Sequence, residues 1–260
     1  IMSATPIPRT LSLIFYGDLD ITTIKDKPAA RQEITTAIIP HSKYADMLGY
    51  IAAQAREGRQ SYFVCPKIEG DEEGTVMSVT GLFEELSQKM RGVRLALLHG
   101  KMKEAEKNAV MADFKAGRYD CLVSTTVIEV GVDVPNATIM VIYNAERFGL
   151  SQLHQLRGRV GRGSQKSYCF LLMGSDTPQA RERLSVIKNN SDGFKIAEAD
   201  LQLRGGGDFM GTRQSGRVLT EIGNLKFPAS VIFTAKAISD EAFSGSFDTA
   251  PLREAAMNKY

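Results

Sequence analysis

Residues 31–175 alternate short apolar runs with stretches of helical periodicity, and this alternation limits the fold more than any other feature of the chain. A strand, an amphipathic helix and a further strand form a βαβ unit, and repeated units build a parallel sheet with helices on its faces. The sequence therefore predicts an α/β fold. The expected strands are 33–39, 61–65, 94–98, 121–124, 138–142 and 168–172, and the expected helices are 44–56, 79–90, 103–115 and 151–160.

Two adjacent helices follow the alternating region. Their apolar residues recur at helical spacing, and 189–193 supplies a turn between them, so a helical hairpin is expected. The buried positions predicted for this hairpin are Ala180, Leu184 and Ile187, then Phe194, Ala197 and Leu201, and those predicted for helix 103–115 are Ala105, Ala109, Ala112 and Phe114. A glycine-rich loop runs to 217, and 218–260 is expected to form a C-terminal helical tail.

Composition places the chain among ordinary soluble globular proteins, with 43% hydrophobic and 24% charged residues. No apolar run is long enough for a membrane span, so no membrane partner is expected. The net charge of +2 means that nucleic-acid binding would depend on local patches. Cys65, Cys121 and Cys169 lie in apolar runs without metal-ligand spacing, which predicts reduced core cysteines in a cytoplasmic protein and no metal site.

Residues 155–163 read QLRGRVGRG. On a continuous helix Gln155, Arg159 and Arg162 would share one stripe, while a second stripe of Leu153, Leu156 and Val160 would be buried. Planar, permanently charged guanidinium groups suit phosphate oxygens and can stabilise the charge on a transferred phosphoryl group. We therefore interpret the segment as a site for phosphate chemistry.

The alternative is a solvated basic helix face. Gly158 and Gly161 favour a function over this alternative, because each weakens a helix by about 1 kcal/mol relative to alanine. Such a cost is expected where another group must approach the backbone closely.

The same segment resembles the QxxGRxGR motif of superfamily 2 helicases. Three further segments resemble motifs of that superfamily, in the same order along the chain: the SATP at 3–6, the HG at 99–100 and the STTVIEVGVD at 124–133. The four together are far more specific than any one of them. The resemblance implies a RecA-like parallel sheet, the second motor domain of such an enzyme, for residues 31–175.

The resemblance also implies roles for individual residues. Arg159 and Arg162 would reach the phosphates of ATP, and Gln155 would order the attacking water. The other residues implied are Gly131 and Asp133 for the nucleotide, Thr125 and Thr126 for the nucleic-acid backbone, and Ser3 and Thr5 for coupling between motor domains. Without the resemblance, the threonines would simply suit a strand and Asp133 would cap a turn.

A glycine-rich GxxxxGK(S/T) loop is absent from the sequence. The only stretch that resembles an acidic DExx box, Asp71-Glu72-Glu73, is followed by Gly74 in a polar stretch with no preceding strand, so we interpret it as solvated loop charge. ATP and Mg²⁺ would therefore be held mainly by a first motor domain of the same polypeptide, for which 1–30 would be the last part and the linker. Residues 1–260 alone are expected to be inactive as an ATPase.

The segment SDGFKIAEADLQLRGGGDFMGTRQSG at 191–216 resembles the translocation motif shared by the RecG and Mfd families of DNA translocases. It is closer to the RecG family at 211–214, although Gly206 and Asp208 depart from that family's RGPGE. The resemblance implies coupling roles for Arg204 and Gln214, and branched double-stranded DNA, such as stalled forks and Holliday junctions, as the substrate. The alternatives are an Mfd-like transcription-repair translocase and a non-enzymatic nucleic-acid-binding module, whose affinity would fall steeply with salt.

Overall fold

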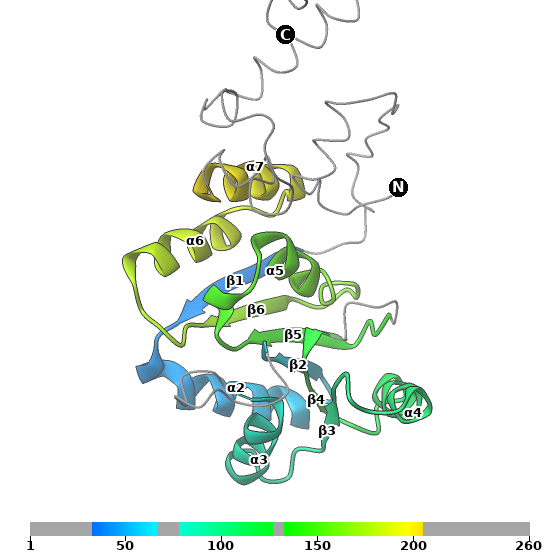
Figure 1. The fold of residues 1–260 in the computed structure, drawn as a ribbon. Coiled ribbons are helices and arrows are strands. Elements are labelled where there is room, and N and C mark those ends of the chain that lie inside the picture. Colours follow the sequence, from blue (N-terminus) through cyan, green and yellow to red (C-terminus); the bar gives the residue numbers. More distant parts are fainter. Residues whose placement is uncertain (1–32, 67–77, 127–132, 205–260) are drawn as a thin grey trace, which may run out of the picture. The chain divides into compact units, whose positions relative to one another are not determined.

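A six-stranded parallel sheet organises the computed structural model, which describes residues 33–66, 78–126 and 133–204. The order of the strands is β1-β6-β5-β2-β4-β3 (Figure 1). Every pairing is parallel, as the alternating pattern predicts. The strands are β1 (Ile34–Ile39), β2 (Gln60–Val64), β3 (Leu95–Leu98), β4 (Cys121–Ser124), β5 (Ala137–Ile142) and β6 (Ser167–Leu172).

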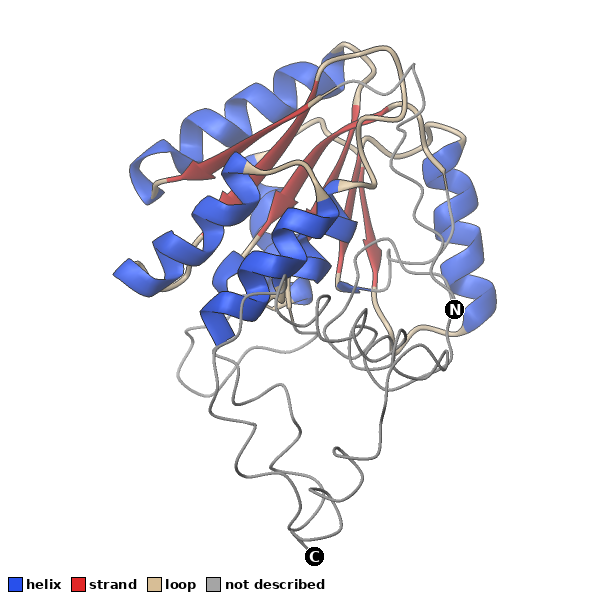
Figure 2. Ribbon diagram, turned by 90° about the horizontal axis from the view of Figure 1, so that it is seen from above, coloured by secondary structure: helices blue, strands red, loops and turns tan. Residues whose placement is uncertain are grey.

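Helices cover both faces of the sheet (Figure 2). One face packs against α2 (Tyr44–Arg56), which follows the short η1 (His41–Lys43), and against α3 (Val79–Lys89). The other face packs against α4 (Glu104–Lys115), α5 (Leu150–Arg157) and α6 (Pro178–Asn189), and α7 (Gly193–Arg204) adds Ile196 to the same core. A short η3 (Ala145–Arg147) joins β5 to α5. Burial from two sides explains why the central strands are continuous apolar runs.

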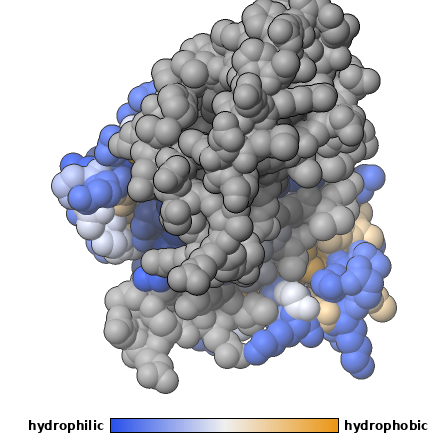
Figure 3. All heavy atoms as spheres, turned by 45° about the horizontal axis from the view of Figure 1, so that its top comes forward, coloured by the Kyte–Doolittle hydropathy of each residue, from blue (hydrophilic) through white to orange (hydrophobic). Residues whose placement is uncertain are grey.

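Local signals set several helix ends. The Ser78 hydroxyl accepts a hydrogen bond from the Gly81 amide at the start of α3, and the Thr177 hydroxyl does the same for Ala180 at the start of α6. Gly117 follows α4 with a φ of 74°, which is the left-handed conformation expected of a glycine stop. The part of the described surface seen in Figure 3 is mostly hydrophilic, with smaller apolar areas.

The predicted buried face of α4 is largely wrong. The three alanines, Ala105, Ala109 and Ala112, are exposed, whereas Phe114 is fully buried as predicted. The helix instead turns Val110 and Met111 toward the core together with Phe114. These positions lie three and four residues apart, and their larger side chains remove more apolar surface from water than alanine does.

The hairpin prediction is confirmed for α6 and partly wrong for α7. Ala180, Leu184 and Ile187 are buried, and Ala197 is buried too. Phe194 is 49% exposed, because Ile196 and not Phe194 faces the core. The side chain of Leu201 lies outside the described residues.

The three cysteines are buried and free, as the sequence predicts. Within 33–66, 78–126 and 133–204, no helix is long and apolar enough to cross a membrane.

Candidate functional site

Arg162 and Asp133 form an ion pair at the amino edge of the sheet. Asp133 shortly precedes β5 and Arg162 shortly precedes β6, and these parallel strands are neighbours, so both segments lie at the edge where the strands begin. The distance from Arg162 Nη1 to Asp133 Oδ1 is 3.2 Å, and Arg162 Nε also donates to the Gly158 carbonyl at 3.3 Å. The structure thus joins residues from two separate motifs.

Glycines allow the arginine loop to approach its neighbour closely. Gly161 has a φ of 75°, which a residue with a Cβ rarely adopts. A Cβ on Gly163 would lie 2.8 Å from the carbonyl oxygen of Pro135, closer than real contacts allow. Val134, which follows Asp133, and Val160, which precedes Gly161, are buried in the same core cluster. The loop carrying Arg162 therefore packs directly on the segment carrying Asp133.

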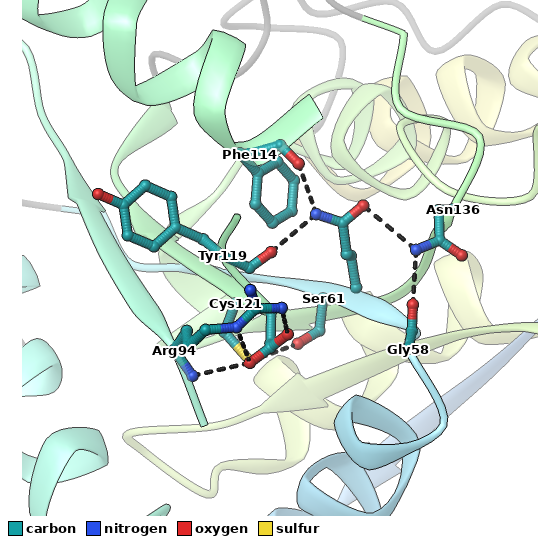
Figure 4. Close-up of polar contacts among 9 residues, drawn as sticks. Gly58, Ser61, Arg94, Phe114, Tyr119, Cys121 and Asn136 are labelled. Carbon is teal, nitrogen blue, oxygen red and sulfur yellow. Dashed lines mark hydrogen bonds and ion pairs between the residues drawn. The ribbon is translucent and has the colours of Figure 1, made fainter. Parts of the chain in front are cut away.

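Two side-chain amides anchor the segment after Asp133, and their contacts are drawn in Figure 4. Asn136 Nδ2 donates to the Gly58 carbonyl at 2.7 Å and to Gln60 Oε1 at 3.3 Å. Gln60, only 3% exposed, donates in turn to the carbonyls of Phe114 at 2.6 Å and Tyr119 at 2.8 Å. The position of the Asp133 segment is therefore tied to the end of α4.

Tyr62 of β2 is buried close to the charged side chains of Arg159, Arg162 and Asp133. Burial raises the pKa of its phenol to about 12, while the charges of Arg162 and Arg159 act to lower it and that of Asp133 acts to raise it. The phenol is therefore neutral at physiological pH, and the four side chains share one neighbourhood. The Tyr62 ring also packs against Phe114, with 5.1 Å between the ring centroids.

The expected helical stripe of Gln155, Arg159 and Arg162 is wrong in its geometry. Helix α5 ends at Arg157 with Gly158 as its C-cap, so only Gln155 lies on the helix and the two arginines belong to the loop that follows. Gly161 cannot continue the helix with its positive φ. The buried side of the prediction is confirmed, since Leu153, Leu156 and Val160 are fully buried.

Arg157 is a residue that the sequence interpretation missed. Its side chain is only 5% exposed, although arginine is rarely buried. The available signal was its spacing, because position 157 stands four residues after the buried Leu153 and so falls on the core-facing side of α5.

The two threonines assigned to nucleic acid lie elsewhere. Thr125 and Thr126 directly follow β4, so they stand at the carboxyl edge of the sheet, opposite the Asp133–Arg162 pair. Thr125 is buried and its amide donates to the Leu98 carbonyl at 3.4 Å. The region expected to bind nucleic acid and the region of the Asp133–Arg162 pair therefore lie at opposite edges of the sheet, one strand length apart. Outside the described residues lie Ser3, Thr5, Gly131, Gln214 and the side chain of Arg204.

The chemistry of the amino edge suits an anion more than a metal. Among the described residues no group of three or more histidine, cysteine, aspartate or glutamate side chains could hold a metal ion. The Arg162–Asp133 pair is partly open to solvent, with side-chain exposures of 34% and 56%. Open ion pairs contribute only about 0–1 kcal/mol. Arg162 is consequently held in place but can be drawn to a stronger anion such as a phosphate.

Comparison with known protein families gives two matches. Residues 42–164 match the helicase conserved C-terminal domain, and residues 190–241 match the C-terminal part of domain 3 of the ATP-dependent DNA helicase RecG. The chain is 50% identical to the RecG helicase of Thermotoga maritima over 217 residues, which is 83% of the chain and 28% of that relative. It is 42% identical to the Bacillus subtilis RecG helicase over 259 residues, 97% of the chain and 38% of the relative.

Comparison with solved structures also gives matches to helicases. A structure of RecG bound to a three-way DNA junction superposes with a TM-score of 0.68 at 43% identity, covering 91% of the chain and 30% of that protein. The helicase Lhr of Mycobacterium smegmatis, bound to single-stranded DNA and AMP-PNP, shares the fold with a TM-score of 0.50 at 19% identity, covering 73% of the chain and 26% of that protein. The chain spans about a third of the length of the curated relatives it matches.

Proposed function

Because the chain belongs to the RecG family of helicases, we propose that it supplies the second RecA-like motor domain of an ATP-dependent translocase that remodels branched DNA. On this proposal, residues 31–175 would be this domain, 1–30 the end of the first motor domain and the linker, 176–217 the hairpin and translocation loop, and 218–260 a C-terminal helical tail. The whole protein acts in the cytoplasm, in DNA repair and recombination.

The observation that carries this proposal is the meeting of Asp133 and Arg162 at 3.2 Å. In superfamily 2 helicases the matching residues contact the nucleotide, and here they come together without any direct sequence proximity. Two arginines near a partly open edge fit the phosphates of ATP.

ATP, when bound with Mg²⁺, supplies the phosphoryl group that is transferred to water. Arg159 and Arg162 would hold its phosphates, Gln155 would orient the water, and Gly131 and Asp133 would contact the rest of the nucleotide. Mg²⁺ would be held mainly by the first motor domain. Thr125 and Thr126 at the carboxyl edge would hold the DNA backbone, and Ser3, Thr5, Arg204 and Gln214 would couple the two events.

The direct test is made on the intact protein. We expect ATP hydrolysis that branched DNA stimulates, together with unwinding of a three-way junction. A linear duplex serves as the comparison substrate. An intact protein that binds a junction with a steep salt dependence but hydrolyses no ATP would support the non-enzymatic alternative instead.

Residues 1–260 alone are expected to hydrolyse no ATP, because the sequence lacks the phosphate-binding loop that a motor needs. A coupled-enzyme ATPase assay on the purified fragment, with and without junction DNA, checks this. ATP hydrolysis that copurifies with the fragment through successive columns would contradict the proposal that the first motor domain is needed to hold ATP and Mg²⁺.

Gly163→Ala in the intact protein is expected to lower the DNA-stimulated ATPase by about 10- to 100-fold, since a misplacement near 1 Å has this effect at an active site. The added methyl would force the arginine loop away from the Pro135 carbonyl, now 2.8 Å from the Cβ position. Gly49→Ala, in α2, is the matched control, because no atom lies within 4 Å of its Cβ position. Equal turnover by the two variants would show that the close approach is unimportant.

A further inference from the structure

Two neutral side-chain amides, those of Gln60 and Asn136, meet at the amino edge of the sheet, close to Asp133 in the chain. Asn136 Nδ2 donates to Gln60 Oε1 at 3.3 Å, and the backbone amide of Gln60 donates to the Asn136 carbonyl at 3.1 Å. The orientation of the Gln60 amide is fixed, because its nitrogen faces two carbonyl oxygens and only its oxygen is left to accept from Asn136. Asn136 and these carbonyls are seen together in Figure 4.

Asn136 belongs to a tight turn that directly follows Asp133. A backbone hydrogen bond of 3.0 Å across 134–137 closes this turn. At the same point the pairing of β2 with β5 shifts by one residue, between Gln60 and Ser61. Such a bulge interrupts the ladder of strand hydrogen bonds, and bulges beside active sites redirect neighbouring side chains. The regular ladder therefore ends before it reaches Asp133, and the two side-chain amides hold the turn instead.

The amide pair connects this turn to helices on both faces of the sheet. Asn136 also donates to the carbonyl of Gly58, which follows α2, at 2.7 Å. Gln60 donates to the Phe114 carbonyl, in the last turn of α4, at 2.6 Å. That carbonyl already accepts a hydrogen bond from the Gly117 amide at 3.0 Å, so the end of α4 does not by itself require Gln60. The buried Gln60 amide is better explained by the turn that it holds.

Uncharged donors suit a position beside Asp133. The Asp133 carboxylate is 56% exposed and pairs with Arg162 at 3.2 Å. A cationic anchor in the place of the amides would compete with Arg162 for this carboxylate and would attract phosphate oxygens to the wrong point. Neutral amides fix the backbone and leave the charges of Asp133 and Arg162 available.

We propose that Gln60 and Asn136 are positioning residues that hold Asp133 where the nucleotide meets it. This inference rests on the proposed function, in which Asp133 contacts the nucleotide. Each amide acts through the turn and not through a contact of its own. A contact that is made equally in the ground state and the transition state affects KM and leaves kcat unchanged. Loss of the amides should therefore weaken the binding of ATP more than it slows hydrolysis at saturating ATP.

The test measures KM and kcat for DNA-stimulated ATP hydrolysis by the intact protein. For Asn136→Ala we expect KM for ATP to rise about tenfold and kcat to stay within about threefold of the wild type. Asn136 is exposed, so the shorter side chain leaves no buried cavity. Gln60→Met keeps the buried volume but removes the donors, and it should raise KM as well. A merely structural role would reduce the amount of folded protein, which lowers the apparent kcat and leaves KM unchanged.

A double-mutant cycle shows whether the effect passes through Asp133. Asp133→Ala should itself raise KM, and adding Asn136→Ala should then change KM by less than about twofold, because the residue to be positioned is gone. Asn108→Ala is the matched control, since Asn108 is an exposed asparagine on α4, and its KM should equal that of the wild type.

Two results would overturn the positioning role: effects of Asp133→Ala and Asn136→Ala that multiply independently, or an unchanged KM in both Asn136→Ala and Gln60→Met. A wild-type protein without DNA-stimulated hydrolysis, or an unchanged KM in Asp133→Ala, would instead contradict the proposed function on which the inference rests.

Discussion

Arg162→Ala in the intact protein is expected to lower the DNA-stimulated ATPase by a factor of about 10³ to 10⁵, the usual loss when an arginine that stabilises a transferred phosphoryl group is removed. The ion pair with Asp133 is partly open to solvent and therefore weak, so its loss alone should barely affect stability. The expected result is a folded protein that binds junction DNA with nearly normal affinity and turns over almost no ATP.

Arg118→Ala provides the control for this experiment. Arg118 is another exposed arginine in an ion pair with an aspartate, 2.7 Å from Asp113, but it lies beyond the end of α4 and outside the residues assigned to the nucleotide. Its ATPase should match the wild type. If Arg162→Ala kept a rate within a few-fold of Arg118→Ala, the assignment of Arg162 to phosphoryl transfer would be wrong.

Phe114→Ala is expected to have the largest effect on stability. Removing a fully buried phenylalanine typically costs about 3–5 kcal/mol, because apolar contacts are lost and a cavity remains. For a domain of this size that corresponds to a fall in Tm of roughly 6 to 20 °C. The ring packs on Tyr62, which neighbours Arg159 and Arg162, so residual activity should fall more steeply on warming than in the wild type.

Thermal unfolding of the intact protein, followed by calorimetry, measures this effect. Phe194→Ala is the comparison, because Phe194 is 49% exposed and leaves no cavity when shortened. A Tm for Phe114→Ala within 2 °C of that of Phe194→Ala would contradict the view that the α4 face of the sheet is a close-packed core.

The parallel sheet was predictable because its strands are short and its central strands are buried from both sides and therefore mostly apolar. β5, Ala137–Ile142, is buried at every position, and β4, Cys121–Ser124, is also buried throughout and begins where its apolar run does. The cysteines followed from the same reasoning, since each lies inside such a run.

The end of α5 was not predictable from periodicity. The spacing of Gln155, Arg159 and Arg162 fits a helix, but helical spacing describes side chains and carries no information on the backbone angle of Gly161. Arg157 was missed for a different reason: an arginine is expected at the surface, and its buried hydrogen bonds, among them one to the carbonyl of Ile187 far along the chain, arise only in the folded structure.

The pairing of Asp133 with Arg162 also depends on tertiary structure. Family resemblance places both residues at the nucleotide, whereas their own sequence neighbourhoods suggest a turn cap and a basic face. The contact arises because β5 and β6 are neighbours and Gly163 lets the two preceding segments touch. The separation of Thr125 from this pair, at the opposite edge of the sheet, likewise follows from strand direction and not from distance in sequence.

A structure of the intact protein bound to a non-hydrolysable ATP analogue and a three-way junction tests the central claim most directly. The distance to measure joins the guanidinium of Arg162 to the γ-phosphate oxygens. We predict a hydrogen bond of about 2.7–3.2 Å. A guanidinium that faces away from the triphosphate, still paired with Asp133, would contradict the account.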